Sequence, residues 1–145
     1  MTAVFENQEL QFIYPENWKL SQSQDSDDFV EISLETPEGG IWSVSVFNDG
    51  STEHELLEAC ASALSEQYED FERSDFSGEV CGFDSIGFDA HFYCLDFLVT
   101  AQARALGSGG QTLNIFCQAE SREFDNQKEV FAAITQSLLS NLKPQ

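Results

Sequence analysis

The chain has 145 residues, 41% of them apolar, which is enough to bury one hydrophobic core, so we expect a single domain over residues 1–145. Its formal net charge of −20 disfavours nucleic acid and anionic membranes as partners, because both are bound mainly through lysine and arginine. The charge is −8 over residues 1–48, −12 over residues 49–96 and zero over residues 97–145. The acidic residues 1–96 are compatible with a role in solubility, with a basic protein partner or with weak cation binding. Self-association would meet the least electrostatic repulsion at residues 97–145.

The start of the chain, MTAVFENQEL, has neither the basic region nor the long apolar region of a signal peptide. No apolar stretch is long enough to span a bilayer, so we expect a cytoplasmic protein. The cysteines show no C-x-x-C spacing. We expect reduced, buried thiols that act as small hydrophobic side chains, at Cys60, Cys81, Cys94 and Cys117.

The first third of the chain predicts short strands. Alternating apolar residues indicate a strand over residues 10–15 that ends at Pro15, a turn, and a second short strand from Trp18 to Leu20. The polar segment SQSQDSDD, residues 21–28, is expected to be an exposed loop. Two alternating segments then flank the turn TPEGG, which predicts a hairpin of residues 30–34 and 42–46.

The middle of the chain predicts a helix and further strands. Thr52 and the glutamate three residues later fit a capping box, and apolar residues follow at helical spacing as far as Tyr68. The segment FERSDFSGEV, residues 71–80, predicts a short strand with a weak pattern. Between residues 86 and 105 the apolar positions change from even to odd, so we favour two strands with a turn or bulge near residues 95–97.

The last third predicts a hairpin and a helix. GSGG, residues 107–110, is expected to be a hairpin loop, and a strand returns over residues 113–119. Asp125 is the expected N-cap of a final helix whose apolar stripe contains Phe131, Ile134, Leu138 and Leu142. This order of elements predicts an α+β fold, a mostly antiparallel sheet of about six to seven strands sandwiched by helices.

Three sequence features accompany that order. They are an early F-x-Y-P-x-x-W-x-L stretch (Phe12, Tyr14, Pro15, Trp18 and Leu20), the hairpin turning at TPEG, and a last helix with F-x-x-I-x-x-S-L (Phe131, Ile134, Ser137 and Leu138). Together they resemble the PsbP-like superfamily, which includes the PsbP subunit of photosystem II, the Mog-type Ran-binding factor and many bacterial proteins of unknown role. The resemblance implies a PsbP-like α/β/α sandwich and a non-enzymatic, protein-binding role, chaperone-like in some members. The chain lacks the export signal of PsbP, and its acidity does not support binding to Ran.

Asp89, His91 and Tyr93 share one face of a predicted strand and could converge on a small ligand. His91 and Cys94 lie three positions apart, on opposite faces, so they do not form a nucleophile and base pair. The sequence therefore predicts no catalytic residue. It predicts no metal or cofactor either, because DSDD is not followed by the glycine and glutamate of a calcium loop, and GSGG joins two strands rather than leading into a helix.

Tyr14 and Trp18 flank Pro15, and two interpretations are open for their rings. Rings on either side of a turn usually pack on the core, but they could also form an exposed recognition surface.

Three functions are compatible with the sequence. The leading hypothesis is a non-catalytic protein-binding or adaptor module with a partner that carries basic residues, and it predicts an exposed apolar patch rimmed by carboxylates. One alternative is a small-molecule carrier or enzyme with a pocket around Asp89, His91 and Tyr93. Another is a chaperone-like protein with a groove for an apolar helix. The oligomeric state is left open.

Overall fold

The computed structural model describes residues 1–7 and 10–142. Within these ranges one antiparallel sheet has the strand order β3–β4–β5–β9–β8–β7–β6, and β1 (Thr2–Asn7) pairs with β2 (Leu10–Pro15) as a separate two-stranded sheet. The strands of the large sheet are β3 (Lys19–Ser26), β4 (Phe29–Glu35), β5 (Ile41–Phe47), β6 (Glu69–Val80), β7 (Phe83–Cys94), β8 (Phe97–Ser108) and β9 (Gln111–Glu120). The helices are α1 (Glu53–Gln67) and α2 (Ser121–Ser140). The predicted α+β class, with its antiparallel sheet between helices, is confirmed.

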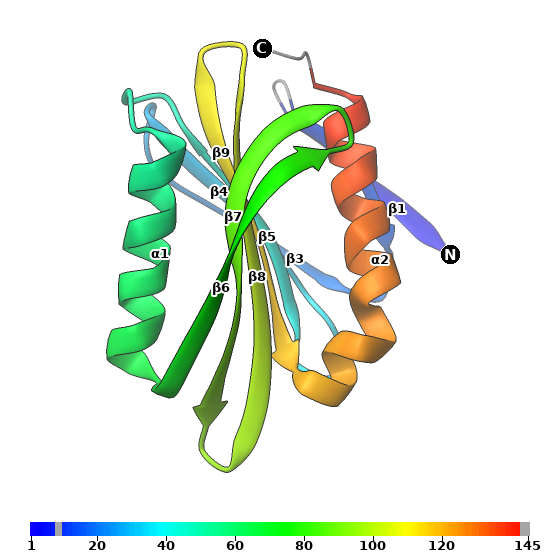
Figure 1. Ribbon diagram of the computed structural model, residues 1–145. Coiled ribbons are helices and arrows are strands. Elements are labelled where there is room, and N and C mark those ends of the chain that lie inside the picture. The colour runs from blue at the N-terminus through cyan, green and yellow to red at the C-terminus, as the bar shows by residue number, and fades with distance from the viewer. Residues whose placement is uncertain (8–9, 143–145) are drawn as a thin grey trace.

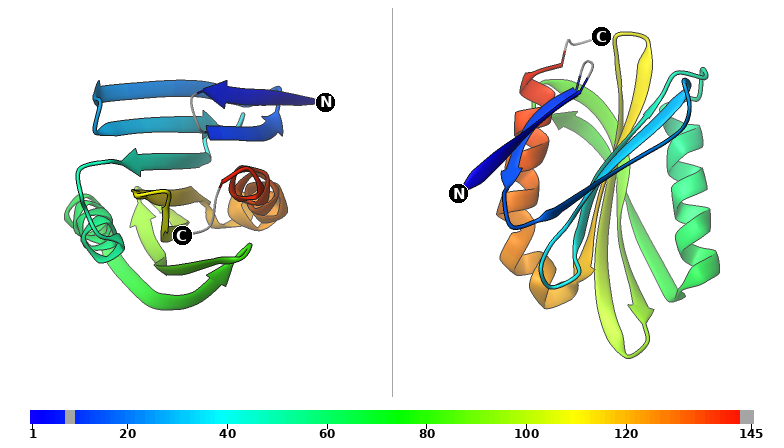
Figure 2. Two further views of the ribbon diagram at one scale, coloured as in Figure 1. Left: turned by 90° about the horizontal axis from the view of Figure 1, so that it is seen from above. Right: turned by 180° about the vertical axis from the view of Figure 1, so that it is seen from behind.

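The two helices cover opposite faces of the large sheet (Figure 1). Paired residues on neighbouring strands lie on the same face. Ala103 of β8 lies opposite Phe116 of β9 and packs with α1, whereas Cys117 belongs to the core under α2. The β1–β2 ribbon packs beside α2 (Figure 2). Its Phe12 contacts the buried ring of Trp42. The sheet therefore has two separate apolar cores, one on each face.

Helix α1 begins where the sequence predicted. The side-chain oxygen of Thr52 accepts a hydrogen bond from the backbone N–H of Glu55 at 3.1 Å, and the Glu55 carboxylate accepts one from the backbone N–H of Thr52 at 3.0 Å. This reciprocal pair is a capping box. The helix ends before Tyr68, whose ring stacks on Phe92 and fixes the end of the helix against the sheet.

The change of apolar parity marks a tight hairpin, as predicted. Cys94 pairs with Phe97, so only Leu95 and Asp96 connect β7 to β8. Leu95 has a φ of 58°, in the left-handed region that leucine avoids. The loop predicted at GSGG is the β8–β9 turn, where Gly109 and Gly110 both have positive φ as a two-residue hairpin requires.

Two strands differ from the sequence prediction. The segment predicted as an exposed loop, residues 21–28, is mostly strand, because β3 runs to Ser26 and pairs with β4, with a shift of register between Ser23 and Ser26. Strand β3 lies at the edge of the sheet, so its outer side can stay in solvent. Backbone hydrogen bonds to β4 are enough to keep this polar segment extended. The other is β1, which the sequence analysis did not predict and whose Phe5 stacks on Phe12.

The bounds of two further elements also differ. Strand β6 is longer than the predicted 71–80 because its partner β7 extends its ladder back to Glu69. Helix α2 begins at Ser121 rather than after Asp125, since the Glu120 carboxylate accepts a hydrogen bond from the Arg122 backbone N–H at 2.6 Å and caps the helix five residues earlier.

Candidate functional site

Asp89, His91 and Tyr93 share one face of β7, as predicted, but they do not converge. Asp89 accepts a hydrogen bond from Arg104 at 2.9 Å, whereas His91 and Tyr93 continue along the strand toward the β7–β8 turn and are exposed. None of the three lines the two large cavities described below. Their role in ligand binding stays a prediction.

Tyr14 and Trp18 both pack on the core beneath α2. Trp18 is only 6% exposed, and its ring meets the edge of Phe131 with 5.6 Å between centroids. Tyr14 is half-buried and lies 6.0 Å from the ring of Phe12. Their packing contacts account for both rings in the free chain.

The turn between β7 and β8 carries the most exposed large apolar side chains of the sheet. We call Tyr93, Leu95, Phe97 and Leu98 the hairpin patch. Leu95 is 89% exposed and Phe97 is 62% exposed, while Tyr93 and Leu98 face each other across the two strands. Apolar side chains gathered at one end of a sheet in this way are typical of an interaction surface. The hairpin projects from the end of the sheet, beyond both helices (Figure 1).

A hollow of about 550 Å³ lies beside the hairpin patch. Its walls come from the β7–β8 hairpin, the β4–β5 turn and the start of α2, and it is lined by Leu95, Phe97, Glu38, Glu120, Arg122 and Glu123 among others. One oxygen of the Glu123 carboxylate is buried without a hydrogen-bond partner among the described residues. The hollow is therefore apolar on the hairpin side and mainly acidic on the other.

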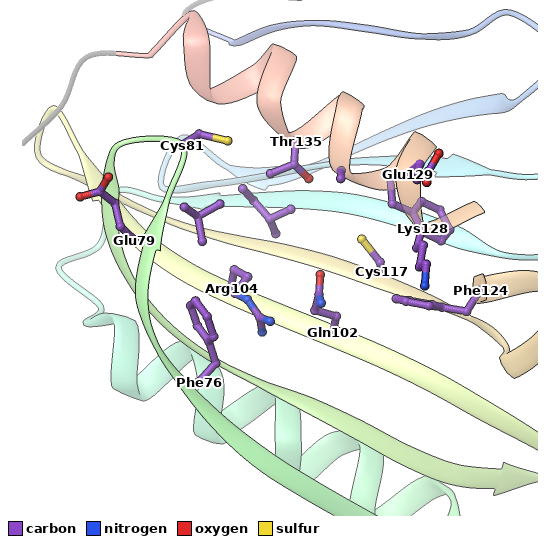
Figure 3. A pocket seen from close by; sticks show the side chains of 14 residues that line it. Phe76, Glu79, Cys81, Gln102, Arg104, Cys117, Phe124, Lys128, Glu129 and Thr135 are labelled. Carbon is purple, nitrogen blue, oxygen red and sulfur yellow. The ribbon is translucent and has the colours of Figure 1, made fainter. Parts of the chain in front are cut away.

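A second cavity, of about 590 Å³, lies between α2 and the sheet (Figure 3). We call it the α2 cavity. The β6–β7 hairpin curls over the sheet and closes one side with Phe76, Glu79, Val80 and Cys81. The remaining lining comes from β8 (Gln102 and Arg104), β9 (Ile115 and Cys117) and α2 (Phe124, Lys128, Glu129, Phe131, Ala132 and Thr135). Cavities of this size with few polar groups are typical of sites for small ligands.

Arg104 is fixed on the floor of the α2 cavity. Its Nη2 donates to Asp89 at 2.9 Å, and its Nη1 donates to the backbone carbonyls of Phe88 and Ala103 at 3.2 and 2.9 Å. The guanidinium lies over the ring of Phe76, 3.9 Å from its centroid, and the side chain is only 12% exposed. These three hydrogen bonds and the cation–π contact with Phe76 together hold the guanidinium in one orientation.

All four cysteines are free thiols, and they differ in environment. Cys117 is buried beside the α2 cavity, and burial raises its pKa to about 12, with the nearby Arg104 charge acting in the opposite direction. Burial also raises the pKa of Cys60 to about 11. The expectation of burial is wrong for Cys81, which is exposed in the β6–β7 turn with a φ of 50° because a two-residue turn requires a left-handed residue there.

The described residues show no group of three or more His, Cys, Asp or Glu that could hold a metal ion. In the same part of the chain, no helix is long and apolar enough to cross a membrane.

No family model matches the chain, and no curated protein matches it. Among solved structures, it is similar to cyanobacterial PsbP (CyanoP) from Synechocystis sp. PCC 6803, with a TM-score of 0.67 and 13% identity over 94% of this chain and 90% of that chain. The chain has a PsbP-like fold. This confirms the resemblance that the Y-P-x-x-W turn and the order of elements indicated.

Two other solved structures share the PsbP-like fold of this chain. LpqN, which is involved in cell envelope biogenesis of Mycobacterium tuberculosis, has a TM-score of 0.56 and 14% identity over 86% of this chain and 79% of that chain. PA94 from Pseudomonas aeruginosa, a protein of unknown function, has a TM-score of 0.53 and 10% identity over 94% and 95%. None of the three is described as an enzyme. At these identities the likeness shows the fold alone.

Sequence reasoning missed the residues that line both hollows. Leu95 gave a usable signal, because the predicted turn at residues 95–97 put an apolar residue where a polar one is normal. Arg104 and Lys128 both lie in the last third of the sequence, whose net charge is zero. Most of the carboxylates lie earlier in the sequence. The meeting of Arg104 and Lys128 at one cavity depends on how α2 crosses the sheet, which no local pattern indicates.

Proposed function

We propose that this chain is a non-catalytic protein-binding module that contacts its partner through the hairpin patch. The observation that carries the proposal is Leu95, which is 89% exposed at a φ of 58°. Leaving a leucine in water forgoes roughly 1.5–3 kcal/mol of burial, and a left-handed backbone costs a non-glycine residue roughly 1–2 kcal/mol. The two-residue turn accounts for the left-handed backbone but not for a leucine at that position, so the exposed apolar side chain is the feature that supports a contact formed on binding.

The surroundings of the hairpin patch favour a basic partner. The hollow beside it carries Glu38, Glu120 and Glu123, and Arg122 is the one cation among the described residues that line it. The unpartnered, buried oxygen of Glu123 can accept a hydrogen bond from an incoming lysine or arginine. We therefore expect the partner to insert an apolar side chain beside Leu95 and Phe97 and to place basic residues against the start of α2.

The experiment is a pull-down from the native lysate with three tagged baits: the unaltered chain, Leu95→Ser combined with Phe97→Ser, and Val4→Ser. Val4 is the matched control because it is also an exposed apolar residue, 59% exposed, on the separate β1–β2 ribbon. Bound proteins are identified by mass spectrometry at low salt and at roughly 0.5 M salt, where exposed charges are screened. Circular dichroism of each bait checks that it is folded.

We expect a protein that the unaltered chain and Val4→Ser retain equally, that the double variant loses, and that is retained less at high salt. Equal retention by all three baits would place the binding surface elsewhere and overturn the proposal. Retention that depends on the patch but is the same at both salt concentrations would contradict a basic partner and favour the chaperone-like alternative, in which the patch receives an apolar helix.

A further inference from the structure

The α2 cavity gathers cations in a chain that has few. Only six lysines and arginines stand against 26 carboxylates, yet Arg104 and Lys128 line the same cavity. Lys128 forms no ion pair with any carboxylate of the described residues, although Glu129 is its neighbour on α2. Lys128 is exposed on α2 at the mouth of the cavity, so its ammonium group is free to meet an anion that enters the cavity.

The polar groups of the cavity lie on one side of it. In Figure 3 the Lys128 side chain extends from α2 toward the sheet, on the side where Gln102 projects from β8. The Gln102 amide makes no hydrogen bond with the described residues, so both its N–H and its carbonyl groups are available to a ligand. Arg104 lies next to Gln102 on the same strand and is already oriented by Asp89 and Phe76. A head group held between Lys128 and Gln102 would therefore lie near a guanidinium of fixed orientation, whose charge is balanced by Asp89.

Most of the remaining lining is apolar. Aromatic and aliphatic side chains approach it from three elements: Phe76 and Val80 from β6, Ile115 from β9, and Phe124, Phe131 and Ala132 from α2. Glu79 lies at the end of the cavity far from Lys128 (Figure 3). Its charge and that of Glu129 would repel a ligand with several negative charges, so the cavity fits one negative charge on an apolar body.

We propose that the α2 cavity binds an amphipathic monocarboxylate, with its carboxylate between Lys128 and Gln102 and its apolar chain between α2 and the β6–β7 hairpin. This site lies away from the hairpin patch, on the face of the sheet beneath α2, and does not depend on the protein-binding proposal.

The test uses dodecanoate as the probe and dodecanol as its uncharged counterpart, with affinities from isothermal titration calorimetry on the full chain. Ala132→Trp fills the mouth of the cavity, and Ala133→Trp is its matched control because Ala133 is an exposed neighbour on α2 that does not line the cavity. Lys128→Gln removes the proposed head-group cation. Lys19→Gln removes the same charge from β3, outside the cavity, and controls for net charge.

We expect dodecanoate to bind the unaltered chain, Ala133→Trp and Lys19→Gln alike, and to bind Ala132→Trp at least about tenfold more weakly, since the added ring occupies the site. Lys128→Gln should weaken dodecanoate about tenfold, as the loss of a charge-assisted hydrogen bond does, and leave dodecanol unchanged. Absence of dodecanoate binding, or binding that Ala132→Trp leaves intact, would overturn the site. Equal effects of Lys128→Gln on both probes would overturn the recognition of a carboxylate.

Discussion

Gly87 lies directly opposite Arg104 on the neighbouring strand, and the absence of a side chain at Gly87 is what allows the arginine to lie flat across the sheet. A Cβ atom at Gly87 would overlap the carbonyl oxygen of Ala103 and would come within 3.0 Å of Arg104 Cδ. Since the backbone carbonyl is held in the β7–β8 ladder, it has little room to move. The glycine thus determines how Arg104 reaches Asp89 and Phe76.

Gly87→Ala should therefore lower the free energy of unfolding by about 1–3 kcal/mol, as overpacking against fixed backbone does. Gly78→Ala on the adjacent strand β6 is the matched control, because its added methyl group would meet only the Phe76 ring, at 3.3 Å, which can shift. Urea denaturation of both variants and the unaltered chain measures the difference. A loss at Gly87 no larger than that at Gly78 would show that the ladder adapts.

The Arg104–Asp89 ion pair should stabilise the fold more than the Arg73–Asp75 pair, although both have N···O distances of 2.9 Å. Arg104 is 12% exposed and Arg73 is 29% exposed, so solvent screens the second pair more. We expect Asp89→Asn to cost about 1 kcal/mol and Asp75→Asn no more than about 0.5 kcal/mol in urea denaturation. Equal losses would mean that solvent reaches both pairs alike.

Local signals in the sequence predicted the elements that local interactions define. The capping box at Thr52 identified the start of α1, and the parity change before Phe97 identified the β7–β8 turn. Strand β3 was missed because its polar residues are held extended by the ladder with β4 rather than by burial. The start of α2 was misplaced because Glu120, an uncommon cap residue, precedes the more usual Asp125.

The candidate sites were harder to predict because they depend on contacts between distant segments. The strand face of Asp89 was predicted from a period of two, but its pairing with Arg104 required the strand order of the sheet. Lys128 and Arg104 both line the α2 cavity, but Lys128 belongs to α2 and Arg104 to the sheet on the other side of the cavity. Periodicity assigns a residue to a face, and it does not say which elements lie above that face.

The Cys117 thiol should make stability fall with alkaline pH. Burial raises its pKa in the folded chain from 9.0 to about 12, so the folded state holds the proton more tightly than the unfolded state. The resulting stabilisation is fully present below about pH 9 and is lost as pH rises toward 12. Chemical denaturation at several pH values in this window should give a steeper decline for the unaltered chain than for Cys117→Ala. Parallel declines of the two proteins would show that ionisation of Cys117 does not contribute to the loss of stability at alkaline pH.

Leu95 should be a position where stability and binding oppose each other. Asparagine tolerates the left-handed backbone better than leucine and gives up no internal packing at a side chain that is 89% exposed. Leu95→Asn is therefore expected to raise the free energy of unfolding by about 0.5–1 kcal/mol while it weakens capture of the partner. Leu98→Asn is the matched control, because the same change at a neighbouring strand position without positive φ should give no gain. A Leu95→Asn variant less stable than the unaltered chain would mean that the leucine packs within the free molecule, and the physical basis of the hairpin patch as a docking surface would be lost.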